Sequence, residues 1–238
     1  MEFLPPIYDE GINFENHEVN VQGVGSDSCF CLPFVVDASG VSVQVGIAGP
    51  TSWRSLQASN DSALEGLFSA AENTLNESEN SMSEIDAVFF CEGPGSTLGL
   101  RIAAAFVRTI AWSCPLIEKI FQYNSLDLAA RMNGEMNTSI QASFRRGFRF
   151  VRTGQEPIGK KEIVPEEKAL EIHQECIHLP DFRNPKHPPP PAKIINYDLS
   201  SARGLADLLP ISTPSESAVP YSPRPAEFTK WSKPEIQQ

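Results

Sequence analysis

The stretch between residues 86 and 112 constrains the fold more than any other part of the chain. Residues 86–91 are predicted as a strand that is continuously apolar from Ala87 onward, which is typical of a strand buried on both faces. Gly93-Pro94-Gly95-Ser96 follows, and its glycines allow a sharp turn and a close backbone approach. A helix with apolar residues on nearly every side then extends over 98–112. This strand, turn and helix predict an α/β protein whose sheet is covered by helices.

Three short strands are predicted upstream of this unit. The segments 32–37, 41–47 and 53–58 are rich in β-forming residues, and Ala38-Ser39-Gly40 forms a tight turn between the first two. Ser62 and Glu65 make a capping box that begins a helix over 62–76. A further strand at 115–117 and a helix at 125–132 complete the first half. The order of these elements is that of one lobe of an actin-like, ribonuclease-H-like fold.

The second half carries weaker signals. Residues 138–144 and 148–153 alternate and predict a hairpin, while helices are expected from Pro165 to about residue 174 and over 200–209. We divide the chain into an N-terminal extension at 1–27, an N-terminal lobe at 28–118 and a C-terminal lobe at 119–238. The last of these includes a proline-rich loop at 185–191 and a proline-rich tail.

Charge and cysteine content narrow the classes of function. The chain has 19 basic and 30 acidic residues, a net charge of −11, which opposes direct binding of a phosphate backbone. A short basic cluster at 145–152 is interpreted as a solvated strand edge. Five cysteines without a CxxC motif indicate reduced thiols. With no signal-peptide pattern and no apolar stretch of about 20 residues, the expectation is a cytoplasmic protein without a membrane span.

The glycine loop, residues 93–96, allows two interpretations. It is either a strand-to-helix turn that needs glycine for packing, or an anion-binding helix start. The helix after it must be covered on two sides, by its sheet and by the preceding helix, a partner chain or both. The candidate anion contacts are Gly93, Pro94, Gly95, Ser96, Gly99 and Arg101.

The same segment resembles a known family. Residues 92–101, EGPGSTLGLR, closely resemble the GPGSFTGLR signature of the TsaB (YeaZ) family of tRNA threonylcarbamoyladenosine biosynthesis proteins, with Thr97-Leu98 in place of Phe-Thr. Residues 36–45 resemble the opening strand pair of that family, within the wider Gcp-like, peptidase M22-like superfamily. Weaker similarity is present at 143–147 and 220–224.

The resemblance implies a two-lobed actin-like fold and a non-catalytic scaffold subunit. In that family the subunit pairs with a TsaD-like catalytic subunit, which modifies adenosine 37 of tRNA, and a TsaE-like ATPase cycles the complex. The implied interface consists of helices 62–76 and 98–112. This chain alone is expected to hold no cofactor, with ATP or ADP at the complex interface, to form a homodimer when alone, and to meet tRNA only through the complex. The expected partner-facing residues are Leu64, Leu67, Phe68, Ala71, Leu75, Ala104, Val107, Arg108 and Ala111.

Other functional classes stay open at this point. An actin-like small-molecule kinase or ATPase would use Asp37 near the first strand, although a turn-forming role at the strand end is the favoured explanation of that residue. A metal site would draw on His173, Cys176 and His178, but no metalloprotease motif accompanies them. The remaining alternative is an interaction module of another complex.

The charge predicts the behaviour of the isolated protein toward tRNA. Because a net charge of −11 repels the phosphate backbone, we expect no binding at submicromolar protein concentration near physiological salt. A gel-shift titration measures this, and a submicromolar complex without a partner would contradict it.

Overall fold

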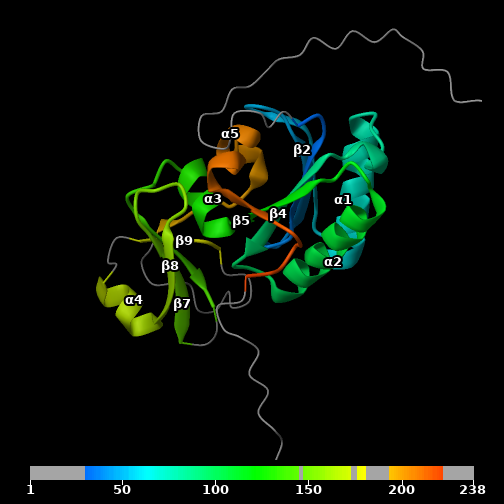
Figure 1. Ribbon diagram of the computed structural model, residues 1–238. Coiled ribbons are helices and arrows are strands. Elements are labelled where there is room, and N and C mark those ends of the chain that lie inside the picture. Colours follow the sequence, from blue (N-terminus) through cyan, green and yellow to red (C-terminus); the bar gives the residue numbers. More distant parts are fainter. Residues whose placement is uncertain (1–29, 145–146, 173–175, 181–192, 222–238) are drawn as a thin grey trace, which may run out of the picture.

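The computed structural model describes residues 30–144, 147–172, 176–180 and 193–221, and two mixed sheets dominate these ranges (Figure 1). The predicted N-terminal extension, proline-rich loop and most of the tail lie outside them. The first sheet has the strand order β11-β5-β4-β1-β2-β3. Its strands are β1 (Pro33–Asp37), β2 (Val43–Ala48), β3 (Trp53–Ser59), β4 (Ala87–Gly93), β5 (Lys119–Asn124) and β11 (Ser212–Ser215).

The register of the first sheet confirms the expected meander. β1, β2 and β3 are antiparallel neighbours, with Val36 opposite Val45. β4 runs parallel to β1 on one side and to β5 on the other. Residues 87–91 of β4 are all buried, because helices cover both faces of the sheet at this position.

Helices cover the first sheet from opposite sides (Figure 1). α1 (Ala63–Glu77) and α2 (Thr97–Ser113) pack on the face that presents Phe34, Val88 and Phe90. The other face, with Phe89 and Tyr123, meets α3 (Ser125–Met132), α5 (Leu205–Leu208) and the 3-10 turns η2 (Leu199–Ser201) and η3 (Leu209–Ile211). Trp53 of edge strand β3 donates its indole N–H to the carbonyls of Leu199 and Ala202. The polar tip of a large ring is thereby satisfied where it joins distant segments.

The second sheet has the order β10-β9-β6-β7-β8. Its strands are β6 (Ser139–Ser143), β7 (Phe148–Thr153), β8 (Lys160–Pro165), β9 (Cys176–His178) and β10 (Lys193–Ile194), and α4 (Glu166–Ile172) follows β8. Helix α3 belongs to two cores at once. Its Leu128 packs with the first sheet, whereas Leu126 packs with Ile140 and Phe150 of the second. α3 therefore joins the sheets.

Several local predictions are confirmed and three are wrong. The helices at 62–76, 98–112 and 125–132 and the β6–β7 hairpin are present within a residue or two. The strand predicted at 115–117 is instead a turn, in which the Ile117 amide donates to Cys114, and β5 begins at Lys119. β5 and β11 join the first sheet although both follow residue 118. The lobe boundaries themselves stay predictions.

The other two errors concern the second half. The helix expected over 200–209 is interrupted at Gly204, whose φ of 53° is not helical and whose Cβ would come within 2.4 Å of the Gly49 and Ser52 carbonyl oxygens. The last error is a missed strand, β8, which ends at Pro165; the helix expected from Pro165 is present as α4, which begins one residue later. No helix in the described part of the chain combines the length and apolarity that a bilayer crossing requires.

Two adjacent alanines of α2 provide a test of this packing. Ala104 is 1% exposed in the core between α2 and the sheet, whereas Ala105 is exposed. Ala104→Glu would bury a carboxylate without a partner and should lower the free energy of unfolding by about 3 kcal/mol or more, and Tm by about 6 °C or more. Ala105→Glu is the matched control and should melt within a few degrees of the parent. Equal melting curves for the two variants would contradict the helix orientation.

Candidate functional site

The glycine loop lies on the turn between β1 and β2. The Ser96 amide donates to the Ser39 carbonyl at 2.8 Å, and a Cβ on Gly95 would lie 2.2 Å from the same oxygen. A Cβ on Gly99 would lie 2.3 Å from the Ala38 carbonyl oxygen. Only glycine allows this approach of two backbones. Close packing therefore accounts for these glycines.

Ser96 also begins α2. Its hydroxyl accepts the Gly99 amide at 3.2 Å, so both the Ser96 and Gly99 amides have acceptors within the chain. The Pro94 carbonyl accepts from Ser125 at the start of α3. Arg101 is exposed one turn into the helix. Anion binding at this loop stays a prediction, and it would depend on the loop's other amides.

Asp37, the candidate kinase residue, is 1% exposed and surrounded by donors. Its Oδ1 accepts from the Ser39 amide at 2.8 Å and from the Ser39 hydroxyl at 2.6 Å. Its Oδ2 accepts from the hydroxyls of Tyr123 at 3.0 Å and Tyr197 at 2.7 Å. Four hydrogen bonds use the acceptor capacity of the carboxylate. Asp37 therefore holds β1, β5 and the segment around residue 197 together.

The neighbours of Asp37 have shifted pKa values. Burial, with the Asp37 charge second, raises the pKa of Tyr123 and Tyr197 well above 10. The same two causes raise the pKa of the Cys91 thiol, whose sulfur lies 3.9 Å from the Tyr197 hydroxyl. A thiol held protonated in the core is a poor nucleophile. The arrangement suits structural support better than acid–base or thiol chemistry.

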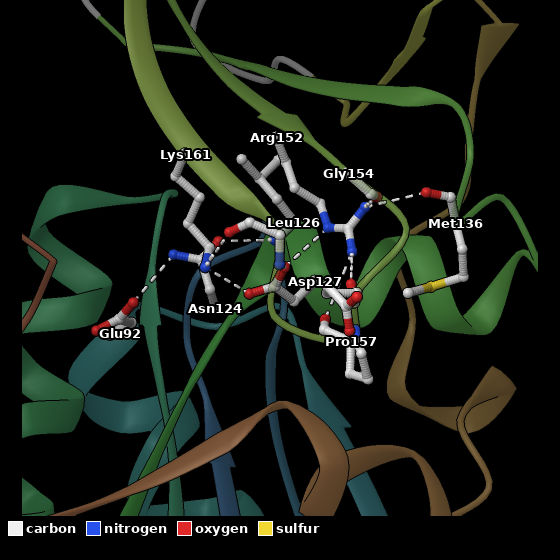
Figure 2. A network of polar contacts seen from close by, with 11 residues as sticks. Glu92, Asn124, Leu126, Asp127, Met136, Arg152, Gly154, Pro157 and Lys161 are labelled. Atoms are coloured by element: carbon white, nitrogen blue, oxygen red, sulfur yellow. Dashed lines mark hydrogen bonds and ion pairs between the residues drawn. The ribbon is translucent and has the colours of Figure 1, made fainter.

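A second buried network connects α3 with the β7–β8 hairpin. Figure 2 shows Arg152 and Lys161 converging on Asp127. Arg152 Nε lies 2.8 Å from Asp127 Oδ1, and Lys161 Nζ lies 2.6 Å from Oδ2. We call these three residues the Asp127 cluster. The Gly159 amide also donates to Oδ1 at 2.9 Å, and a Cβ at Gly159 would come within 2.7 Å of Arg152 Nε.

The Arg152 guanidinium organises the loop at the tip of the hairpin. It donates to the carbonyls of Gly154 at 3.0 Å and Glu156 at 2.7 Å, with longer contacts to Met136 and Pro157 (Figure 2). Arg152 is completely buried, so these bonds and Asp127 replace its hydration. Sequence reasoning placed Arg152 in a surface cluster and missed this role.

Glu92 lies beside the Asp127 cluster, at the end of β4. Asn124 donates to its carboxylate at 3.0 Å. Burial raises the pKa of Glu92, and the Asn124 hydrogen bond and the Lys161 charge partly offset that increase. The described residues contain no group of three or more His, Cys, Asp or Glu side chains placed to hold a metal ion. Of the three candidate metal ligands, His173 and the side chain of Cys176 lie outside the described residues. The ring of His178 contacts the Leu179 carbonyl.

The structure divides the residues expected at the partner interface into two groups. Five of them are already buried in the core under α1 and α2 in the chain by itself: Leu67, Ala71, Leu75, Ala104 and Val107. Leu64, Phe68 and Arg108 are exposed, and Ala111 is partly exposed. Helical spacing alone did not show which side of each helix faces the sheet, and the interface itself stays a prediction.

The exposed sides of α1 and α2 form an apolar surface, which we call the helical face. It comprises Leu64 and Phe68 on α1 and Leu98, Arg101, Ala105, Arg108 and Trp112 on α2. Trp112 is 89% exposed and Phe68 57%, although Phe68 still contacts Phe106 edge to face at 5.4 Å. Large apolar side chains gathered on one surface are typical of a protein–protein interface. Sequence reasoning did not assign Leu98, Arg101, Ala105 or Trp112 to the partner interface, and it placed Arg101 among the candidate anion contacts.

Comparisons with known proteins agree on this architecture. Residues 59–135 match the family model described as TsaD: tRNA N6-adenosine threonylcarbamoyltransferase. YeaZ from Pseudomonas aeruginosa superposes with a TM-score of 0.58 at 17% identity, covering 80% of this chain and 99% of that one. A second Pseudomonas aeruginosa structure, described as similar to peptidase YeaZ, gives 0.59 at 17% identity, covering 81% and 99%. The chain is YeaZ-like in its fold.

The YeaZ-like architecture confirms the resemblance and the actin-like, ribonuclease-H-like fold class expected from the sequence. The matched range 59–135 extends from the end of β3 to just beyond α3, and so contains α1, the glycine loop and α2. No curated protein matches the chain by sequence.

The buried tyrosines predict a loss of stability at alkaline pH. In the unfolded chain tyrosine ionises near pH 10, whereas Tyr123 and Tyr197 stay protonated in the fold. Their contribution is complete below pH 10 and is lost as pH rises toward the higher folded pKa, because the folded state then binds more protons. The free energy of unfolding should fall by about 1.4 kcal/mol per pH unit for each tyrosine.

Tyr123→Phe isolates this effect. Its free energy of unfolding should be lower by about 1 kcal/mol below pH 9, for the lost hydrogen bond, and should fall less steeply above pH 10. Urea unfolding between pH 7 and 11 measures both. Identical alkaline slopes for the variant and the parent would contradict the assignment.

Proposed function

We propose that this chain is a non-catalytic subunit of the machinery that forms threonylcarbamoyladenosine at position 37 of tRNA. In this proposal it binds a TsaD-type catalytic subunit, a TsaE-type ATPase acts on the complex, and tRNA meets the chain only there. The helical face carries the proposal. It is an exposed apolar surface built from α1 and α2, both within the range that matches the TsaD family model.

The buried acids support a non-catalytic role. A kinase-like mechanism needs a carboxylate that can reach a substrate hydroxyl or a metal ion. Asp37 is saturated by four donors, and Asp127 is paired with Arg152 and Lys161. We extend the proposal to the nucleotide: this chain holds none by itself, and ATP or ADP is bound where the subunits meet. Cytoplasmic location and self-association of the isolated chain belong to the same proposal.

The subunit's mode of binding follows from the composition of the helical face. Phe68 and Trp112 are aromatic anchors of the type that dominates interface energetics, and Arg101 and Arg108 are the basic residues beside them. Burial of these groups against another pair of helices would remove the apolar surface from water at about 25 cal/mol per Å². A helix-on-helix complex is the simplest occupant of such a face.

A substitution on the helical face tests the proposal. Phe68→Glu places a carboxylate in the centre of the face and should weaken binding to a TsaD-type subunit by about 30-fold or more, because aromatic anchors often contribute 2 kcal/mol. Thermal melting should be nearly unchanged, since Phe68 is 57% exposed. Calorimetric titration of the purified subunits measures the affinity.

Ile158→Glu is the matched control, because it makes the same chemical change at an exposed position of the β7–β8 loop. In cells depleted of the natural protein, the parent and Ile158→Glu should restore the modified tRNA nucleoside and Phe68→Glu should not. Full binding by Phe68→Glu would reject the interface. Absence of any complex with the parent would reject the pairing and favour an interaction module of another assembly.

A further inference from the structure

A pocket opens on the helical face between α1, the 3-10 turn η1 (Met82–Glu84) and α2. Its volume is about 400 Å³. The interior is apolar and combines core side chains with the exposed ring of Phe68. The apolar lining consists of Phe68, Ala71, Leu75, Met82 and Phe106. A hollow of this kind at an apolar surface is suited to a side chain inserted from outside.

The rim of the pocket is polar and rich in acceptors. Glu72 and Asn76, one turn apart on α1, line it together with Asn80 and Ser81. Glu72 and Asn76 are exposed, and no hydrogen bond or ion pair joins the side chain of Glu72, Asn76 or Asn80 to another described residue. An unpaired carboxylate and two amide oxygens thus surround an apolar interior. The basic residues of the helical face, Arg101 and Arg108, are not among the pocket's lining residues.

This combination favours one class of occupant. Arginine and lysine carry an apolar stem of three or four methylene groups and a cationic head, so the stem can lie in the apolar interior while the head meets the rim. A phosphate or another anion would be repelled by Glu72. A purely apolar side chain would make no favourable contact with the carboxylate or with the two amides.

We infer that this pocket receives a long cationic side chain, arginine or lysine, from a helix of the TsaD-type partner. The inference rests on the proposed function and specifies how that interface is recognised. Glu72 pairs with the cationic head, Asn76 and Asn80 accept its remaining N–H groups, and Phe68 and Phe106 flank the stem. Glu72 therefore contributes to the choice of partner, because a helix with an acidic residue at this position would be repelled.

The test compares two carboxylates. Glu72→Gln removes the charge at the pocket, and Glu118→Gln removes one from an exposed loop of the same lobe. Affinity of the full chain for the purified TsaD-type subunit is measured by calorimetry at 50 and 300 mM NaCl. Glu72→Gln should weaken binding about fivefold at low salt and flatten the salt dependence, and Glu72→Lys should weaken it further. Glu118→Gln should match the parent at both salt concentrations.

A second variant tests the apolar part of the pocket. Asn76→Phe adds a ring at the exposed mouth and should weaken binding about tenfold without a change in melting temperature. Binding of the subunit that is unaffected by both Glu72→Gln and Asn76→Phe would overturn the pocket inference and leave the proposed function standing. Absence of any complex with the parent would overturn both.

Sedimentation of the chain alone tests whether the pocket is occupied instead by a side chain of a second copy of this chain. A second copy could supply Arg101 or Arg108 of its own α2. If Glu72→Gln weakens self-association and leaves the affinity for the TsaD-type subunit unchanged, the occupant is a second copy and the inference is wrong. If the partner affinity falls and self-association does not, the inference is supported.

Discussion

The relative position of the two sheets depends on the charge of Asp127. This residue lies on α3, the helix that packs against both sheets, and it is paired with Arg152 and Lys161 of the hairpin opposite. Burying three charges is costly, and the pairing compensates only while all partners are present. Loss of one partner from such a buried pair typically costs about 3–5 kcal/mol, a large part of the stability of a domain. The Arg152 guanidinium also holds the carbonyls of the loop after β7, and Asp127 accepts the amide of Gly159 in the same loop.

Two of the buried acids of this fold, Asp37 and Asp127, are satisfied in different ways. Asp37 accepts only from neutral donors, whereas Asp127 is balanced by two cations. In both cases the chain supplies every partner, so neither carboxylate is directed at a ligand. By contrast, the carboxylate of Glu72 lies at the surface, beside an apolar hollow, and has no partner among the described residues.

The first half of the fold could be predicted because its signals are local. Ser62 with Glu65 begins α1, Ser96 begins α2, and residues 43–48 form β2 of the meander, although all six of them are buried. The second half depends on pairing between distant segments, so β8 and β11 left no readable pattern. Arg152 shows most clearly what could not be predicted from the sequence, because its partner Asp127 is 25 residues away and neither residue has a distinctive neighbour. Likewise, helical spacing alone could not tell that Ala104 faces the sheet and Phe68 faces outward.

The hydrogen bonds between Asp37 and Tyr197 and between Trp53 and the carbonyls near residue 200 have a consequence for biosynthesis. They span 160 and about 146 residues of chain, and β11 closes the edge of the first sheet from an even later position. A ribosome releases the meander and both surface helices long before these segments emerge. Until then the face of the first sheet that carries Phe89 and Tyr123 is covered only in part, by α3, and some apolar strand residues stay exposed. The sheet whose strands are made first is therefore completed by segments that are made last.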